Sequence, residues 1–179
     1  SQSWHRAFDS IRYGKVPVIC VLKGAVIGGG LEIAVSTHIR VAERSAYYGL
    51  PEGQRGIFLG GGGSVRITRL IGVDRVQDMM LTGRTLQSAE AHAMGVSQYL
   101  VEDGAGLARA RELATRIAAN SPMTNFAVIQ ALPRIADTDA GNGLFTESLM
   151  AAIAQTSPEA KQRLADFLEG RAAKVKPAG

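Results

Sequence analysis

Three consecutive glycines stand directly before a run that is typical of a helix, in the stretch AVIGGGLEIAVSTH at residues 25–38. Glycine weakens regular structure, so a run of three usually marks a point where another group approaches the backbone closely. The first charged residue after the run is Glu32. The stretch therefore predicts a turn that enters a helix, with a carboxylate in the first helical turn.

The segments on either side of this turn predict an α/β layout. Residues 16–22, before the glycines, form an apolar run rich in β-branched side chains, which is typical of a buried strand. We expect a short helix over residues 31–36 and short strands over residues 39–43 and 45–50. A strand, a glycine turn, a helix and another strand in this order favour an α/β fold.

The carboxy-terminal half is expected to be almost all helix. A second glycine run, GGGGSVRITRLIG at residues 60–72, repeats the first pattern and predicts a helix that ends at Gly72. Ser121 and Ser157 each precede a proline, which is the signature of a helix cap followed by proline at the first helical position. A short strand is expected over residues 97–101. The remaining helices are expected over residues 3–12, 73–81, 88–94, 105–119, 122–136, 143–155 and 158–170.

Length and charge restrict the class of protein. The 179 residues suit one well-packed domain, and no apolar stretch reaches the length of a membrane span. The net charge of +4 comes from scattered basic residues, which argues against a nucleic-acid partner. The single cysteine, Cys20, allows no disulfide framework, so we expect a cytoplasmic protein. The basic residues near the carboxy terminus are either a solvated end or a weak anion-binding candidate.

The glycine runs do not match the common phosphate-binding motifs. The dinucleotide pattern fails at Ile33 after the first run and at Val65 after the second, and no P-loop lysine follows either run. The three histidines are scattered and no Cys/His spacing fits a metal site, so no metal is expected. Gly63–Ser64 lacks the second glycine of a hydrolase nucleophile turn. Backbone amides and carboxylates remain as the candidate chemical groups.

Backbone amides at the start of a helix suit a site where negative charge develops. Glu32 would lie near such a charge, and Glu52 follows in the stretch YYGLPEGQRG, where Pro51 and Gly53 fix an irregular backbone. Two carboxylates that lie close together resist ionising at once, which allows one to act as an acid and the other as a base. Spacing alone favours the simpler interpretation, in which Glu32 is a favourable first-turn acid and Glu52 a solvated loop residue.

At this point the residues resemble a known family. The segment from KVPVICVLKGAVIGGGLEIAV to GIFLGGGGSVRITRLIG, continued by MLTGRTLQSAEAHAMGVSQYLV, is similar to the signature of the enoyl-CoA hydratase/isomerase, or crotonase, superfamily. The resemblance implies a crotonase-like α/β fold, a spiral core of ββα units with a helical oligomerising region. It implies that residues 1–102 form the carboxy-terminal part of the core and residues 103–179 a trimerisation region.

The resemblance also implies a reaction. Gly29 would offer its N–H to the thioester carbonyl oxygen of an acyl-CoA, and Glu32 and Glu52 would add water across the 2,3 double bond of a 2-enoyl-CoA. A double-bond isomerase that uses Glu52 as its base, and a non-catalytic acyl-CoA-binding protein, remain alternatives. No separate cofactor is expected, because coenzyme A is part of the substrate, and the expected assembly is a homotrimer or a dimer of trimers. Substrate-binding roles are implied for Gly28, Pro51, Gly60 and Lys174.

The sequence departs from the family pattern at several positions. Leu59, Ser64–Val65 and His38 replace residues that are usually a proline, a Thr–Gln pair and an aspartate, which leaves the acyl preference open. A basic position often used for the coenzyme A phosphates falls on Gly170, so Arg171 or Lys174 is a candidate substitute. Family members carry an amino-terminal region before the point where this sequence begins, and it normally supplies the second oxyanion donor. A chain that truly began at Ser1 would be expected to bind coenzyme A poorly and to show little activity.

Overall fold

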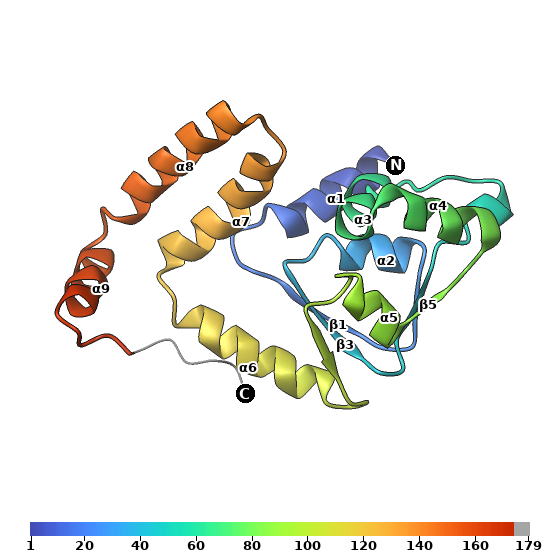
Figure 1. The fold of residues 1–179 in the computed structure, drawn as a ribbon, viewed down its shortest axis with the longest axis horizontal. Coiled ribbons are helices and arrows are strands. Elements are labelled where there is room, and N and C mark those ends of the chain that lie inside the picture. Colours follow the sequence, from blue (N-terminus) through green and yellow to red (C-terminus); the bar gives the residue numbers. More distant parts are fainter. Residues whose placement is uncertain (174–179) are drawn as a thin grey trace. The chain divides into compact units, whose positions relative to one another are not determined.

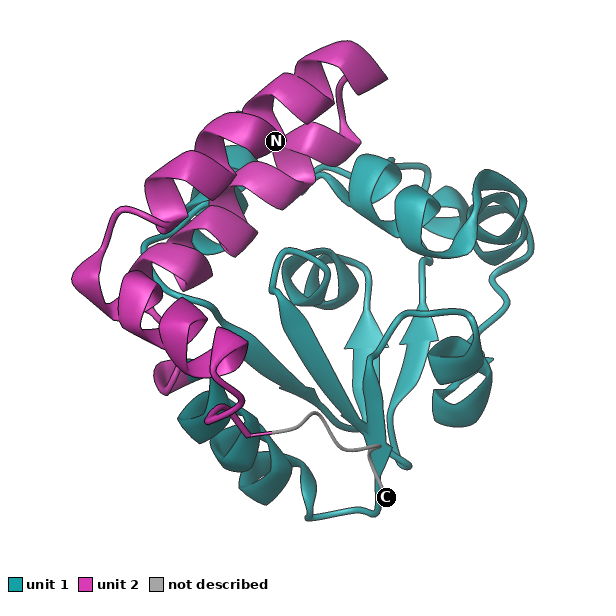
Figure 2. Cartoon of the chain, turned by 60° about the vertical axis from the view of Figure 1, so that its left-hand side comes forward, with its two compact units in different colours: residues 1–117 teal, residues 118–179 magenta. Residues whose placement is uncertain are grey.

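The computed structural model describes residues 1–173, which fall into two compact units (Figure 2). The first unit comprises residues 1–117 and the second begins at Ala118. The helix expected over residues 105–119 packs on strands of the first unit, where its Ala110 and Leu113 cluster with Val41. The first compact unit ends at Ile117, near the end of this helix. The division of the chain at residue 102 and the trimerisation role of residues 103–179 stay predictions.

Six short strands in the first unit form two three-stranded sheets (Figure 1). One sheet has the order β1-β3-β6 and is parallel throughout. The other has the order β2-β4-β5, in which β2 and β4 are parallel and β5 is antiparallel to β4. The strands are β1 (Ile19–Leu22), β2 (Ala25–Ile27), β3 (Ile39–Glu43), β4 (Tyr47–Gly49), β5 (Leu86–Gln87) and β6 (Tyr99–Val101).

The first four strands alternate between the two sheets. After β1, Gly24 adopts a positive φ of 57° and turns the chain into β2 of the other sheet. Helix α2 follows, and then β3 and β4 repeat the same alternation and are again followed by helices. Strand pairs divided between two sheets, each followed by helix, form the ββα core of a crotonase fold, so the expected fold class is confirmed.

The helices occur where the sequence predicts them, with ends displaced by a few residues. The second glycine run begins a helix that ends before Gly72, as expected. Strands β2 and β5 and the 3₁₀-helix η1 are the elements that the pattern missed, because each has only two or three residues. The helical elements are α1 (Gln2–Arg12), α2 (Gly29–Ala34), η1 (Gly53–Arg55), α3 (Gly63–Ile71), α4 (Val73–Thr82), α5 (Ser88–Ala93), α6 (Gly106–Ala118), α7 (Pro122–Ala136), α8 (Ala140–Ala154) and α9 (Pro158–Leu168).

The main core of the first unit fixes the helix that follows the first glycine run. Leu31 and Ala34 of α2 are both 1% exposed and pack in one apolar cluster with Tyr48 and Ile67. Burying a leucine side chain fully contributes roughly 1.5–3 kcal/mol to stability. Because α2 has only six residues, this packing rather than helix propensity holds it in place. The turn before α2 therefore stands on a rigid support.

The second unit consists of helices α7, α8 and α9 within its described residues. Helices α7 and α8 approach closely where a Cβ on Gly143 would lie 3.4 Å from Ile135 Cγ2. Ser157 caps α9 by accepting a hydrogen bond from the N–H of Ala160 at 3.1 Å, as predicted, whereas the side chain of Ser121 makes no cap bond to α7. Over residues 1–173, no helix combines the length and apolarity that crossing a membrane requires.

Candidate active site

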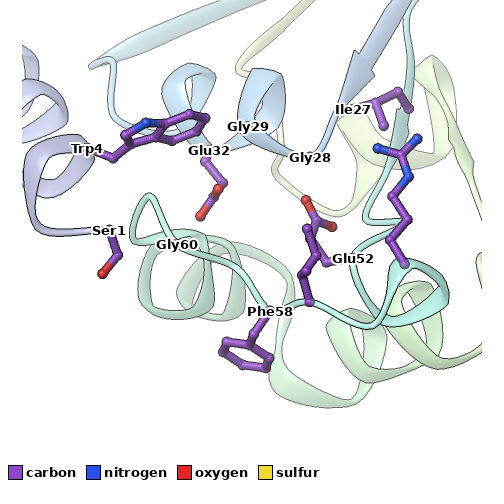
Figure 3. A pocket seen from close by; sticks show the side chains of 11 residues that line it. Ser1, Trp4, Ile27, Gly28, Gly29, Glu32, Glu52, Phe58 and Gly60 are labelled. Atoms are coloured by element: carbon purple, nitrogen blue, oxygen red, sulfur yellow. The ribbon is translucent and has the colours of Figure 1, made fainter.

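A cavity of about 350 Å³ in the first unit brings together most of the residues predicted for the site (Figure 3). Its walls come from α1, the turn into α2, the segment around η1 and the second glycine run. The carboxylates of Glu32 and Glu52 share this space, with Glu32 reaching from α2 and Glu52 from the residue before η1. The predicted residues that line the cavity are Gly28, Gly29, Glu32, Glu52 and Gly60.

The turn before α2 presents a backbone donor to the cavity. Gly28 has a φ of 54° and a ψ of −121°, a conformation that side-chain-bearing residues rarely adopt. Its carbonyl oxygen accepts the N–H groups of Leu31 and Glu32 at 2.9 and 3.0 Å. Gly29 is the first residue of α2, and its N–H has no acceptor within the helix. The cavity therefore contains a main-chain N–H suited to an oxygen atom of a ligand.

Glu32 is held by the second glycine run. Its side chain is buried, and Oε1 accepts the N–H of Gly61 at 2.8 Å and the N–H of Gly63 at 2.9 Å. A Cβ on Gly61 would lie 3.1 Å from Oε2, and a Cβ on Gly63 would lie 2.9 Å from Oε1. A side chain at either position would therefore crowd the carboxylate, and glycine lets the backbone approach it closely. The two glycine runs, separated in sequence, build one site.

Glu52 is held by contact rather than by hydrogen bonds. It is 8% exposed, and its Oε2 is buried without a hydrogen-bond partner in the part of the chain that the structure describes. Its Oε1 would lie 2.5 Å from a Cβ on Gly28, so the missing side chain of Gly28 leaves the space that this carboxylate occupies. Buried polar atoms in native proteins nearly always have a partner. An unpartnered carboxylate oxygen in the wall of a cavity therefore points to a ligand or water.

Arg66 of α3 fixes the loop that holds Glu32. Its Nη1 donates to the carbonyl oxygen of Gly61 at 3.0 Å and to Ser36 Oγ at 3.3 Å. Its Nη2 donates to Asp9 Oδ1 of α1 at 2.6 Å. Charge-assisted hydrogen bonds of this kind are stronger and more directional than neutral ones. One side chain thus ties the glycine loop to α1 and to the residues after α2.

Three other candidates are placed differently. Pro51, expected at the substrate, does not line the cavity, and its carbonyl oxygen instead accepts the N–H of Arg55 at 3.2 Å in η1. Lys174 lies outside the described residues. Arg171 donates to Asp166 Oδ1 at 2.7 Å, so within the described residues its guanidinium is already occupied by a carboxylate.

The positions that depart from the family pattern also lie outside the lining of the cavity. Leu59 belongs to the main apolar core. His38 links the end of α1 to the residues before β1, since its Nδ1 accepts the N–H of Val18 at 2.9 Å and its Nε2 faces the carbonyl oxygen of Arg12 at 3.0 Å. Burial lowers the pKa of His38, which keeps the ring neutral and able to accept. Its role is support of the fold.

Sequence reasoning missed part of the cavity wall. The ring centroid of Trp4 in α1 lies 5.5 Å from that of Phe8, and the same ring covers the start of α2. A Cβ on Gly29 would lie 2.6 Å from Trp4 Cζ3. The exposed apolar residues Ile57 and Phe58, shortly after Glu52, were the sequence signal for this part of the wall, because such residues in a glycine-rich loop often line a site. The lining residues missed are Ser1, Trp4, Ile27, Arg55, Ile57 and Phe58.

Comparison with known proteins identifies the family. Residues 1–177 match the family described as enoyl-CoA hydratase/isomerase. The chain belongs to this enoyl-CoA hydratase/isomerase family. Its membership agrees with the crotonase core described above and with the position of Glu32 and Glu52 in one cavity.

Several relatives of this chain have solved structures or curated sequences. The structure of a "putative enoyl-CoA hydratase" from Rhodopseudomonas palustris is 61% identical, with a TM-score of 0.90, and the match covers 97% of this chain and 67% of that one. The enoyl-CoA hydratase EchA19 of Mycobacterium tuberculosis is 40% identical over 116 residues, which cover 65% of this chain and 44% of that protein. Human enoyl-CoA hydratase domain-containing protein 2, mitochondrial, is 34% identical over 162 residues, 88% of this chain and 56% of that protein. The chain thus spans less than two thirds of these two curated relatives.

Proposed function

We propose that this chain carries the acid–base site of an enoyl-CoA hydratase, which adds water across the 2,3 double bond of a 2-enoyl-CoA. The observation that supports this most directly is the pair of buried carboxylates, Glu32 and Glu52, in one cavity beside the free N–H of Gly29. The family to which the chain belongs includes both hydratases and isomerases by its description. The geometry of the pair favours the first of these reactions.

The N–H of Gly29 would receive the thioester carbonyl oxygen. When a nucleophile adds to the β-carbon of the conjugated thioester, electron density moves onto this oxygen. A preorganised backbone donor stabilises that charge, and loss of one such donor typically lowers the rate by about 10²–10³. Gly28 and the packed helix α2 fix the direction of this N–H before substrate binds.

The two carboxylates would hold and split the attacking water. Because Glu32 Oε1 accepts two backbone N–H groups, its other oxygen is left for water, and Glu52 Oε2 has no partner among the described residues. With one of the two ionised and the other protonated, a water between them donates a hydrogen bond to the ionised carboxylate and accepts one from the protonated carboxyl group. The ionised carboxylate takes a proton from this water as the hydroxyl group bonds to the β-carbon, and the protonated carboxyl group delivers its own proton to the α-carbon. The product is a 3-hydroxyacyl-CoA.

Conversion of either glutamate to glutamine tests the proposal. E32Q and E52Q should each lower the kcat for hydration of a 2-enoyl-CoA by roughly 10²–10⁴, the usual contribution of a positioned acid or base. E102Q is the matched control, because Glu102 is a surface residue whose side chain is 75% exposed and, within residues 1–173, pairs only with Arg44. Its activity should equal that of the wild type. Wild-type hydration rates in folded E32Q or E52Q would contradict the assignment.

Isomerisation is the second candidate, since Glu52 alone has an unpartnered oxygen and could carry a proton between the α- and γ-carbons. A 3-enoyl-CoA substrate separates the two reactions, because an isomerase converts it to the 2-enoyl-CoA while a hydratase leaves it unchanged. Calorimetry with a saturated acyl-CoA, run beside the activity assay, identifies the third alternative, a protein that binds without turnover.

We also propose that the second unit mediates assembly into a homotrimer or a dimer of trimers. Its helices expose many large apolar side chains, which soluble monomers rarely leave uncovered in such number. Sedimentation of the protein should give the mass of three or six copies, and a monomer at all concentrations would contradict this. The exposed residues include Phe126, Leu132, Leu144, Phe145, Phe167 and Leu168.

A further inference from the structure

Arg55 is a cation in the wall of the proposed active site that the hydration mechanism does not use. It is the last residue of η1 and lines the same cavity as Glu32 and Glu52. Glu52 precedes η1 with helical dihedral angles, φ −58° and ψ −42°, and its carbonyl oxygen accepts the N–H of Arg55 at 3.0 Å. In 3₁₀ geometry, side chains three residues apart lie on the same face. The two side chains therefore project to the same side, into one cavity.

The guanidinium of Arg55 is available to a ligand. Within the described residues, it forms no hydrogen bond or ion pair, although the carboxylates of Glu32 and Glu52 line the same cavity. Several other arginines of the first unit are engaged, for example Arg44 with Glu102 and Arg66 with Asp9. A guanidinium carries five donors and is suited to bidentate binding of a carboxylate or phosphate.

We propose that Arg55 binds a carboxylate at the far end of the acyl group, so that the substrate is a short 2-enoyl-CoA that ends in a negative charge. This inference rests on the proposed hydratase function. A neutral acyl chain would cover the guanidinium without satisfying its donors, which is unfavourable. An anionic acyl chain would be repelled by Glu32 and Glu52 unless a cation stood beyond them, and Arg55 is that cation.

The position of Arg55 favours the acyl carboxylate over the coenzyme A phosphates, which carry the same anionic chemistry. Arg55 lies three residues after Glu52, about 6 Å along a 3₁₀ axis. Glu52 acts at the reacting double bond in the proposed mechanism. The phosphates are separated from that bond by the whole pantetheine arm, whereas a terminal carboxylate of a short acyl chain is only a few carbons away. Ile57 and Phe58, which also line the cavity, supply apolar contact for those carbons.

The test compares two five-carbon 2-enoyl-CoA substrates, one that ends in a methyl group and one that ends in a carboxylate. The wild type should hydrate the carboxylate substrate with the higher kcat/KM. R55Q should lower kcat/KM for that substrate roughly 10- to 100-fold, the usual value of hydrogen bonds between charged groups, and leave the neutral substrate nearly unchanged. R55K should recover part of the loss. R44Q, which removes an exposed arginine remote from the cavity, should match the wild type for both substrates.

Each other outcome has a defined meaning. Equal kcat/KM for the two substrates in the wild type overturns the inference and leaves the hydratase proposal intact. Equal loss for both substrates in R55Q, together with weaker binding of free coenzyme A, assigns Arg55 to the phosphates and also overturns it. If neither substrate is hydrated, calorimetry with the saturated five-carbon pair decides the inference alone. Tighter binding of the carboxylate form in the wild type but not in R55Q supports it, and equal binding contradicts it.

Discussion

Replacement of Gly63 by alanine tests whether the second glycine run positions the first catalytic carboxylate. Gly63 is the first residue of α3, where its φ is ordinary, so alanine brings no backbone strain. A Cβ there would lie 2.8 Å from Glu32 Cγ and 2.9 Å from Oε1, whereas ordinary contact begins at 3.4 Å. The glutamate side chain must therefore move by about 0.5 Å, which is the tolerance within which a catalytic group has to be held.

The displacement of Glu32 in G63A should change both the free energy of unfolding and the kcat. Weakening one hydrogen bond to a charged group costs about 1.5–3 kcal/mol, and alanine in place of glycine in a helix returns up to about 1 kcal/mol. G63A should thus lower the free energy of unfolding by about 1–2 kcal/mol. Since a misplacement of 1 Å can cost about 10²-fold in rate, the kcat for hydration should fall by about tenfold or more.

G30A is the matched control for this experiment. Gly30 lies in α2, its φ is ordinary, and no heavy atom lies within 4 Å of where its Cβ would be. Alanine there should raise the free energy of unfolding by about 0.5–1 kcal/mol, because it lowers the conformational entropy of the unfolded chain and has a higher helix propensity than glycine. Urea unfolding and steady-state hydration of a 2-enoyl-CoA give both quantities for each variant. A stable G63A with the kcat of the wild type would refute the view that Glu32 must be held by this loop.

Two further predictions concern stability. Burial lowers the pKa of His38 below 6.5, so at pH values below about 6.5 the unfolded chain binds more protons at this residue than the folded chain. The contribution of His38 to the free energy of unfolding should therefore be constant at higher pH and decrease as the pH falls below about 6.5. Urea unfolding at several pH values should show a smaller decrease in H38Q. Arg40 is 3% exposed, its pKa is lowered to about 10 by burial, and its guanidinium donates to two backbone carbonyl oxygens rather than to a carboxylate. R40M should therefore cost about 2–4 kcal/mol in urea unfolding because both carbonyls lose a buried donor, whereas R44M at the surface should stay within about 0.5 kcal/mol. An R40M variant as stable as R44M would show that water replaces the guanidinium.

The sequence predicted the longer elements well because their signals are local. Helix α7 has the expected bounds, residues 122–136, since proline at its start and apolar spacing act within the segment itself. The strand expected over residues 16–22 is confined to Ile19–Leu22, and β2 was missed. The missed strand β2 lies beyond Gly24, where the chain passes from one sheet to the other, and tertiary packing decides this change. The residues lost from β1 lie at its opposite end, around Pro17, which has no N–H for a strand hydrogen bond. A strand of three residues such as β2 is too short to show the alternation of apolar and polar residues that would reveal it in the sequence.

The candidate site could be predicted only in part for the same reason. Glu32, Glu52 and the glycines at positions 28, 29 and 60 were predicted from the resemblance to the family, and the cavity contains them. The hydrogen bonds from the second glycine run to Glu32 were not predicted, because they join residues about thirty positions apart. Arg55 was overlooked since a single arginine in a loop carries no periodic signal. Its significance comes from sharing a wall with the carboxylates and from having no partner there among the described residues.

The hydrogen bonds from loop 61–63 to Glu32 determine when during folding the catalytic site forms. The N–H groups of Gly61 and Gly63 are 29 and 31 residues away from Glu32 in the sequence, and β3, β4 and η1 lie between them. The carboxylate is therefore held in its orientation only after this intervening segment has folded. Closing such a loop costs conformational entropy, and a loop with few buried contacts can open locally before the whole molecule unfolds. Transient detachment of this loop would silence turnover while both sheets stay intact, so amide exchange at Gly61 and Gly63 should report inactivation at temperatures well below global melting.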